Sequence, residues 1–180
     1  MSVASWAASA TAEEEDEGTA DVLLTLPISR SRILFSKIAA TTTVVFFLSF
    51  LAMANVLVLR GVVDLTIDSG KLLAATISSI SLGFFFTGIA FLVGSFSQRK
   101  GSAIGVVTGV SLIAFLIYSL SALVDDFDAI APYNPMEWGL KGQPLFNGLD
   151  AGGNFKLVIG GLTLLVLAIM KFDKKDISTP

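Results

Sequence analysis

The sequence predicts an all-α integral membrane protein with four transmembrane helices, and three observations lead to this prediction. Hydrophobic residues make up 53% of the 180 residues, and the mean hydropathy is +0.78. Only 15% of the residues are charged, whereas a soluble domain normally carries about 25%. The charges are also clustered, and the runs between the clusters approach or exceed the roughly 20 apolar residues that a helix needs to cross a bilayer.

The predicted transmembrane domain covers residues 38–172 and contains four apolar spans. These spans are 38–59, 72–96, 102–124 and 155–172. A polar segment, residues 1–37, precedes the domain, and a short charged tail, residues 173–180, follows it. The loop of residues 125–154 separates the third span from the fourth and is rich in prolines and glycines, which mark turns.

Lysine and arginine residues predict the orientation of the chain. If the N-terminus is cytoplasmic, eight of the 12 basic residues lie inside and four outside, which obeys the positive-inside rule. The inner group is Arg30, Arg32, Lys37, Arg99, Lys100, Lys171, Lys174 and Lys175. The outer group is Arg60, Lys71, Lys141 and Lys156. We therefore expect both termini to lie on the cytoplasmic side of the cell membrane.

The residue types exclude several classes of function. No Asp, Glu, Lys or Arg falls in the middle of a predicted span, so a pump with its own intramembrane carboxylate is not expected. The chain has no cysteine and no histidine, which removes thiol chemistry, the commonest zinc ligands and a Ser-His-Asp triad. The stretch "DSGKLL" lacks the GxxxxGK[ST] spacing of a phosphate loop. There is no basic stripe for nucleic acid. We expect no enzyme and no catalytic, cofactor or metal residues.

Three glycines open the third predicted span, in "GSAIGVVTG". Gly101, Gly105 and Gly109 recur every four residues, which is a tandem small-xxx-small pattern. Such a pattern creates a helix face that another helix can approach closely. Two partners suit this face: another span of the same chain, or a second copy of the protein.

The polar segment contains a predicted amphipathic helix, in "TAEEEDEGTADVLLTLPISRSR". Thr11 and Glu14 fit a capping box, Thr19 can cap a second short helix, and Pro27 ends it. The apolar side chains on one side of this helix are Val22, Leu23 and Leu26. Such a helix either lies on lipid or docks into a groove on a partner. Because the segment is acidic, anionic headgroups would repel it, and docking is favoured.

The stretch "EEEDEGTADVLLTLPISRSRILFSKIAA" resembles the ABC-2 type permeases, the membrane subunits of one class of ABC transporter. The matching residues are Glu14, Glu15, Glu17, Gly18, Thr19, Leu23, Leu24, Pro27, Ser29, Arg30 and Lys37. The last span and the tail "FDKKDI" are also similar to the end of that family. The resemblance covers about residues 9–177.

The resemblance implies a mechanism in which the segment of residues 13–30 is a coupling helix. In such transporters this helix rests in a groove of a separate ABC ATPase subunit, and closure of the ATPases on ATP moves it. The expected interface residues are Glu14, Glu17, Gly18, Thr19, Leu23, Leu24, Pro27 and Arg30. ATP and Mg²⁺ would bind the partner subunit, and this chain would need no cofactor. The implied direction of transport is export.

The resemblance also implies further spans that this chain lacks. Its four spans correspond to the last four of the family, and "VASWAASA" looks like the end of the span before them. A second permease copy is the expected partner, and either another chain supplies the missing spans or the chain is a truncated remnant. A non-transporting membrane scaffold that recruits a soluble protein through the acidic helix is the alternative function.

Overall fold

The computed structural model describes residues 30–62, 67–96, 100–121, 123–124, 127 and 129–173. Within these residues the regular structure is helical and there is no strand. The long helices are α3 (Arg30–Arg60), α4 (Ser69–Phe96), α5 (Lys100–Ser121) and α8 (Ala151–Asp173). The short elements are the 3-10 helix η2 (Ala131–Tyr133), α6 (Pro135–Leu140) and α7 (Pro144–Asn147). Each of the four long helices is long and apolar enough to cross a membrane, which confirms the predicted fold class. The predicted amphipathic helix of residues 13–30 lies outside the described residues, apart from its last residue.

Helices α4 and α8 begin before the apolar runs that predict them, because a polar residue before each helix satisfies its free backbone N–H groups. Helix α5 instead ends at Ser121, before the predicted end of the third span at residue 124. Asp68 precedes α4, and its Oδ1 accepts hydrogen bonds from the backbone N–H groups of Gly70 (2.7 Å) and Lys71 (3.2 Å). Asp150 precedes α8 and accepts from two backbone N–H groups in the same way. These caps supply acceptors for the first, unpaired N–H groups of each helix. Both helices therefore begin a few residues before their predicted spans.

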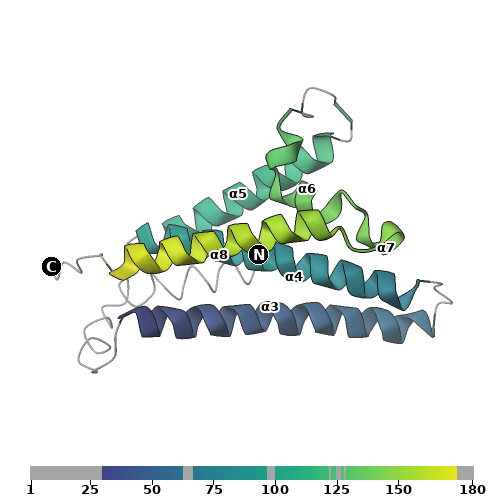
Figure 1. The fold of residues 1–180 in the computed structure, drawn as a ribbon, viewed down its shortest axis with the longest axis horizontal. Coiled ribbons are helices and arrows are strands. Elements are labelled where there is room, and N and C mark those ends of the chain that lie inside the picture. Colours follow the sequence, from purple (N-terminus) through teal and green to yellow (C-terminus); the bar gives the residue numbers. More distant parts are fainter. Residues whose placement is uncertain are drawn as a thin grey trace.

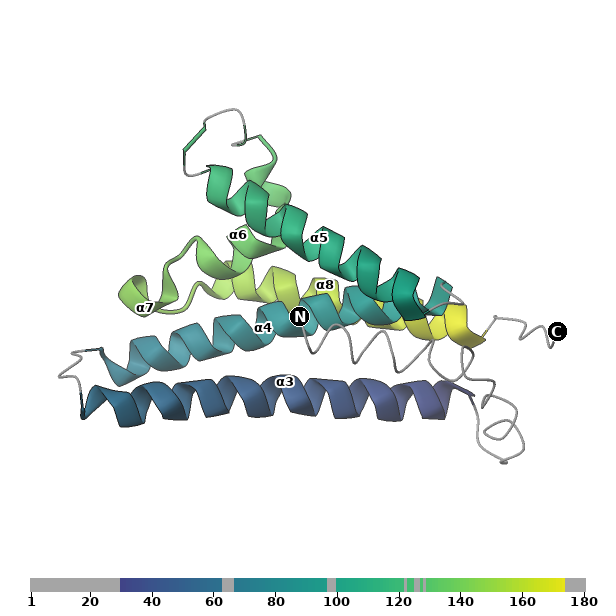
Figure 2. The same cartoon turned by 180° about the vertical axis from the view of Figure 1, so that it is seen from behind.

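Helix α4 lies at the centre of the bundle (Figure 1). It packs against α3, α5 and α8, whereas α3 and α5 contact α4 far more than they contact each other. The opposite view shows α5 crossing the other helices obliquely while α3 runs alongside α4 (Figure 2). The start of α3, the end of α4, the start of α5 and the end of α8 lie at one end of the bundle, which we call the base end. Helices α6 and α7 lie toward the opposite end.

Helices α4 and α8 approach each other closely through glycines. A Cβ atom added to Gly88 of α4 would lie 2.9 Å from the carbonyl oxygen of Gly161 and 3.0 Å from the Cβ of Leu164. A Cβ atom on Gly161 would lie 2.8 Å from Cδ1 of Phe84. No larger residue fits at Gly88 without a shift of the neighbouring backbone. In a membrane, such small residues let helix backbones gain close van der Waals contact.

The glycines of α5 do not pack in this way. A Cβ atom added to Gly105 or Gly109 would meet nothing within 4 Å. The packing against another span of the same chain that we considered for these two residues is therefore absent from the described part of the structure. Gly101 also lies in α5, but its contacts are outside what the structure describes. The alternative, an interface with a second copy, stays a prediction.

Candidate functional site

Most of the predicted coupling interface lies outside the described residues. This applies to Glu14, Glu17, Gly18, Thr19, Leu23, Leu24 and Pro27. Arg30 is the first residue of α3. The predicted coupling segment therefore continues directly into α3 at Arg30.

A hydrophobic core at the base end joins all four long helices. We call it the base core. It consists of Leu34 and Ile38 of α3, Ala90 and Phe91 of α4, Val107 of α5, and Leu165 and Ala168 of α8. Phe91 and Val107 are fully buried, and Leu34 is 1% exposed. The first turns of α3 are thereby packed against α4 and α8, and Val107 joins α5 to the same core.

The base core gives the start of α3 a mechanical link to the rest of the bundle. Leu34 follows Arg30 by four residues, which is about one helical turn or roughly 6 Å of rise. Packed protein interiors are dense and only slightly compressible, so a displacement of one helix is passed to its neighbours. The base core therefore connects the start of α3 to α4 and α8, and through Val107 to α5.

A cavity of about 480 Å³ lies near the middle of the bundle, between α3, α4 and α5. Its lining residues are Val45, Leu48, Ser49, Ser79, Gly83, Phe86, Thr87, Ser111, Leu112, Phe115 and Met136. All of these are uncharged, and most are apolar. The cavity thus offers an apolar space bounded by three of the four long helices, with α6 contributing through Met136.

Helix α6 packs against the middle of α4 and the first turns of α8, and it also contacts α5. Asn134 caps it: its Oδ1 accepts a hydrogen bond from the backbone N–H of Met136 (3.0 Å), and its Nδ2 donates to the carbonyl of Ala114 in α5 (2.8 Å). The side chain of Asn134 is buried. Gly139 lets α6 pack closely, because a Cβ atom there would overlap the side chain of Leu82. Asn134 therefore ties α6 to α5.

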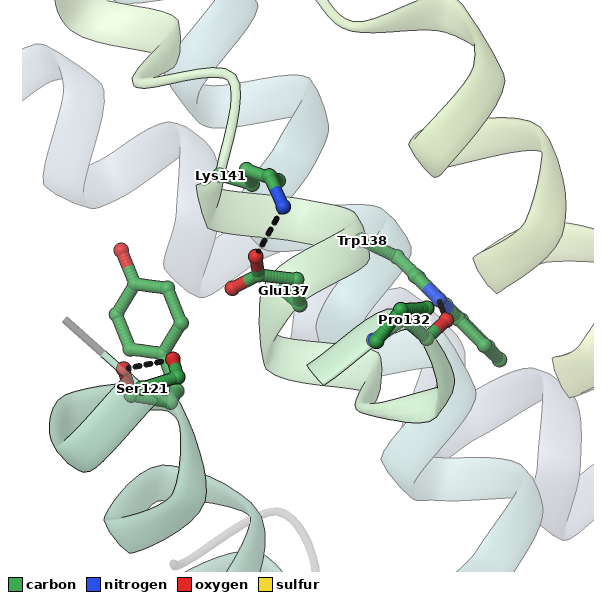
Figure 3. Close-up of polar contacts among 6 residues, drawn as sticks. Ser121, Pro132, Glu137, Trp138 and Lys141 are labelled. Carbon is green, nitrogen blue, oxygen red and sulfur yellow. Dashed lines mark hydrogen bonds and ion pairs between the residues drawn. The ribbon is translucent and has the colours of Figure 1, made fainter. Parts of the chain in front are cut away.

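Polar contacts of α6 and of the residues beside it are shown in Figure 3. Glu137 is nearly buried and pairs with the exposed Lys141, with Oε1 and Nζ 2.8 Å apart. The Nε1 of Trp138 donates a hydrogen bond to the carbonyl of Pro132 (2.6 Å), and its ring lies edge-on to Phe85 of α4, with centroids 6.0 Å apart. Residues 131–147 of the predicted loop thus include three short helices, which contact α4, α5 and α8.

A buried polar contact also joins α4 and α8. The Nδ2 of Asn154 donates to the hydroxyl of Ser78 (3.1 Å) and to the carbonyl of Asp150 (2.8 Å). Both Asn154 and Ser78 are buried. A buried contact of this kind favours one register of the two helices, because a slip would remove the acceptor on Ser78. Across the described part of the chain, Asp and Glu side chains do not gather in a group of three that would hold a metal ion.

Four apolar helices, three of them packed against the central α4, form a hydrophobic core at one end and an apolar cavity at mid-depth, which is the architecture of a multi-pass membrane protein. Residues 1–153 match the family model described as "ABC-2 family transporter protein". The chain therefore belongs to the ABC-2 transporter family and is a permease component of membrane transport. Neither the comparison with curated proteins nor the comparison with solved structures gave a match.

The family match covers most of the chain. It includes the predicted coupling segment of residues 13–30 and the helices α3, α4 and α5. It ends at Gly153, within the first turn of α8. The resemblance of the last span and of the tail to the family lies beyond the matched residues and stays a prediction.

Sequence reasoning missed three features of the site. The close contact at Gly88 and Gly161 had no visible signal, because the two glycines lie on helices that are distant in the chain. The base core was missed for the same reason. Helix α6 did have a signal, since Asn134 followed by Pro135 is the pattern of an N-cap with proline at the first helical position.

Proposed function

We propose that this chain is the membrane-spanning subunit of an ATP-driven exporter and that a separate ATPase drives it through residues 13–30. The observation that carries the proposal is the family match, which includes this segment and runs directly into α3. In this arrangement ATP and Mg²⁺ bind the ATPase subunit, and the permease contributes binding and movement rather than chemistry.

The structure supports a route for the movement. Closure of the ATPases would displace the coupling segment and with it the start of α3. The base core would pass this displacement to the other long helices. The glycine contact and the Asn154–Ser78 hydrogen bond favour α4 and α8 moving as one unit. Helices α3 and α5, which contact each other little, would change their separation across α4.

The orientation that we propose places the base end in the cytoplasm. The basic residues at this end support it, because cytoplasmic flanks of membrane spans carry an excess of lysine and arginine. Among them, the Nζ of Lys171 lies 5.0 Å from the ring centroid of Phe96, so the two helix ends are in contact at the proposed interface with the headgroups. We propose that the protein works in the plasma membrane with a second permease copy or with a chain that supplies further spans.

The first test is a pull-down from detergent-solubilised membranes, with the full chain as bait. A matched bait lacks residues 13–30. We expect the full chain to recover an ATPase with a GxxxxGK[ST] motif and the shortened chain to lose it. If the folded full chain recovers no ATPase, the scaffold alternative is favoured over the transporter.

Point variants within the segment provide a sharper test. Leu23→Glu and Leu24→Glu each place a charge on residues expected at the ATPase interface, while Thr25→Glu adds the same charge at a position outside the expected interface. An interface hot spot is worth about 2 kcal/mol or more, so we expect the leucine variants to weaken ATPase binding by about 30-fold. ATPase stimulation and transport should fall with it. Equal binding and transport in all three variants would refute the coupling role.

A further inference from the structure

The cavity between α3, α4 and α5 has a buried floor and an open mouth. Val45, Phe86 and Thr87 form the floor and are buried. Leu48 of α3 and Phe115 of α5 line the mouth, and both remain substantially exposed. The floor is therefore reached from the side of the bundle, between α3 and α5. Those two helices diverge across α4 (Figure 2).

The lining chemistry selects a neutral and apolar ligand. No charged residue lines the cavity. Three of its hydroxyl groups donate to carbonyls of their own helices: Ser79 to Ala75 (2.9 Å), Thr87 to Gly83 (2.8 Å) and Ser111 to Val107 (2.8 Å). Three of the four lining hydroxyls therefore have no proton to donate to a charged or strongly polar group, and Ser49 is the fourth. A hydrocarbon chain leaves no polar group unsatisfied in such a space.

The size and depth of the cavity point to a single chain. Its volume of about 480 Å³ lies within the range of about 300–1,000 Å³ that is usual for small-molecule pockets. A helix with side chains is about 10–12 Å across, so this volume holds only about one helical turn and is a poor fit for another span. The lining residues of α3, α4 and α5 lie near the middle of each helix, which corresponds to the hydrocarbon region of a bilayer.

We propose that this cavity binds one acyl chain of a bilayer lipid, which enters from the side between α3 and α5. The bilayer that the four apolar helices require supplies such chains at very high local concentration. A chain in this position would separate α3 from α5 and complete the packing of the central part of α4. The site does not depend on the ATPase partner or on the direction of transport.

Photolabelling of the full-length protein tests the proposal. The chain is reconstituted in lipid nanodiscs that contain phosphatidylcholine with a diazirine at the midpoint of one acyl chain. After irradiation, adducts are mapped by mass spectrometry. We expect labelling of the cavity floor at Phe86, which a chain that stays in the bulk bilayer cannot reach. Exposed residues of α8 such as Leu162 and Val166 report ordinary contact with the bilayer.

Two variants fill the cavity from opposite walls: Ser111→Leu on α5 and Ser79→Leu on α4. We expect each to reduce the Phe86 adduct about tenfold relative to the α8 adducts, because one leucine side chain displaces about two methylene groups of the ligand. The matched control is Thr163→Leu. Thr163 is exposed on α8, and its hydroxyl also donates to the carbonyl four residues before it (2.8 Å).

Two results would overturn the proposal. One is labelling at Phe86 that is absent or that stays unchanged in both correctly folded cavity variants. The other is a disulfide between two copies of Leu48→Cys in the bilayer, which would show that a second copy covers the mouth. Neither result bears on the coupling segment, which the pull-down tests with different residues.

Discussion

The close contact of α4 and α8 makes a specific prediction about Gly88. The first atom that a Cβ at this position would meet is the carbonyl oxygen of Gly161, at 2.9 Å. Ordinary contact begins at 3.4 Å, so α8 must move by about 0.5 Å, the difference between the two distances. The obstacle is backbone, which cannot rotate away as a side chain could. We therefore expect Gly88→Ala to overpack the interface at a cost of about 1–3 kcal/mol.

The matched control is Gly105→Ala on α5. Both substitutions gain the same helix propensity, about 1 kcal/mol, because each replaces a glycine inside a long helix. A Cβ at Gly105 meets nothing within 4 Å, so that variant carries no packing cost in a single copy. The propensity gain cancels when the two variants are compared. Their difference in the free energy of unfolding is then the overpacking cost itself, about 1–3 kcal/mol.

The assay is unfolding of the full chain in mild detergent by added sodium dodecyl sulfate, followed by the helical circular dichroism signal. The protein should be at a concentration at which it is a single copy in each micelle. We expect Gly88→Ala to unfold at a lower fraction of dodecyl sulfate than Gly105→Ala. If both variants unfold at the same fraction of dodecyl sulfate, the backbones of α4 and α8 do not approach each other closely at Gly88.

Two further predictions concern the polar contacts of α6 and of Asn134, which precedes it. Asn134→Ala removes the hydrogen bond to the carbonyl of Ala114 and the one from the backbone N–H of Met136. We expect the free energy of unfolding to fall by about 1–3 kcal/mol and amide exchange to become faster in α6 but not in α3. Unchanged exchange in α6 would contradict the role of this residue. Glu137→Gln removes the ion pair with Lys141, whose side chain is 70% exposed, so we expect a loss of only about 0.5 kcal/mol or less. A fall of many degrees in the unfolding temperature would show that the pair matters more than its exposure indicates.

The sequence by itself determined the number and approximate positions of the spans, the clustering of the charges and the family resemblance. These properties are local. The cost of placing each residue in hydrocarbon depends on that residue and its neighbours in the chain, so a run of apolar residues predicts a span without knowledge of its partners. Helix caps are local as well, which is why Asp68 and Asp150 mark the starts of α4 and α8.

Only the tertiary structure decided which helices meet. The spacing of Gly101, Gly105 and Gly109 was visible in the sequence, yet the close contact formed instead at Gly88 and Gly161. The reason is physical: lipid chains are about as apolar as leucine, so burial against another helix gives little hydrophobic gain over burial in lipid. Partner choice then depends on shape and on a few polar contacts, and these form between residues that are distant in the chain.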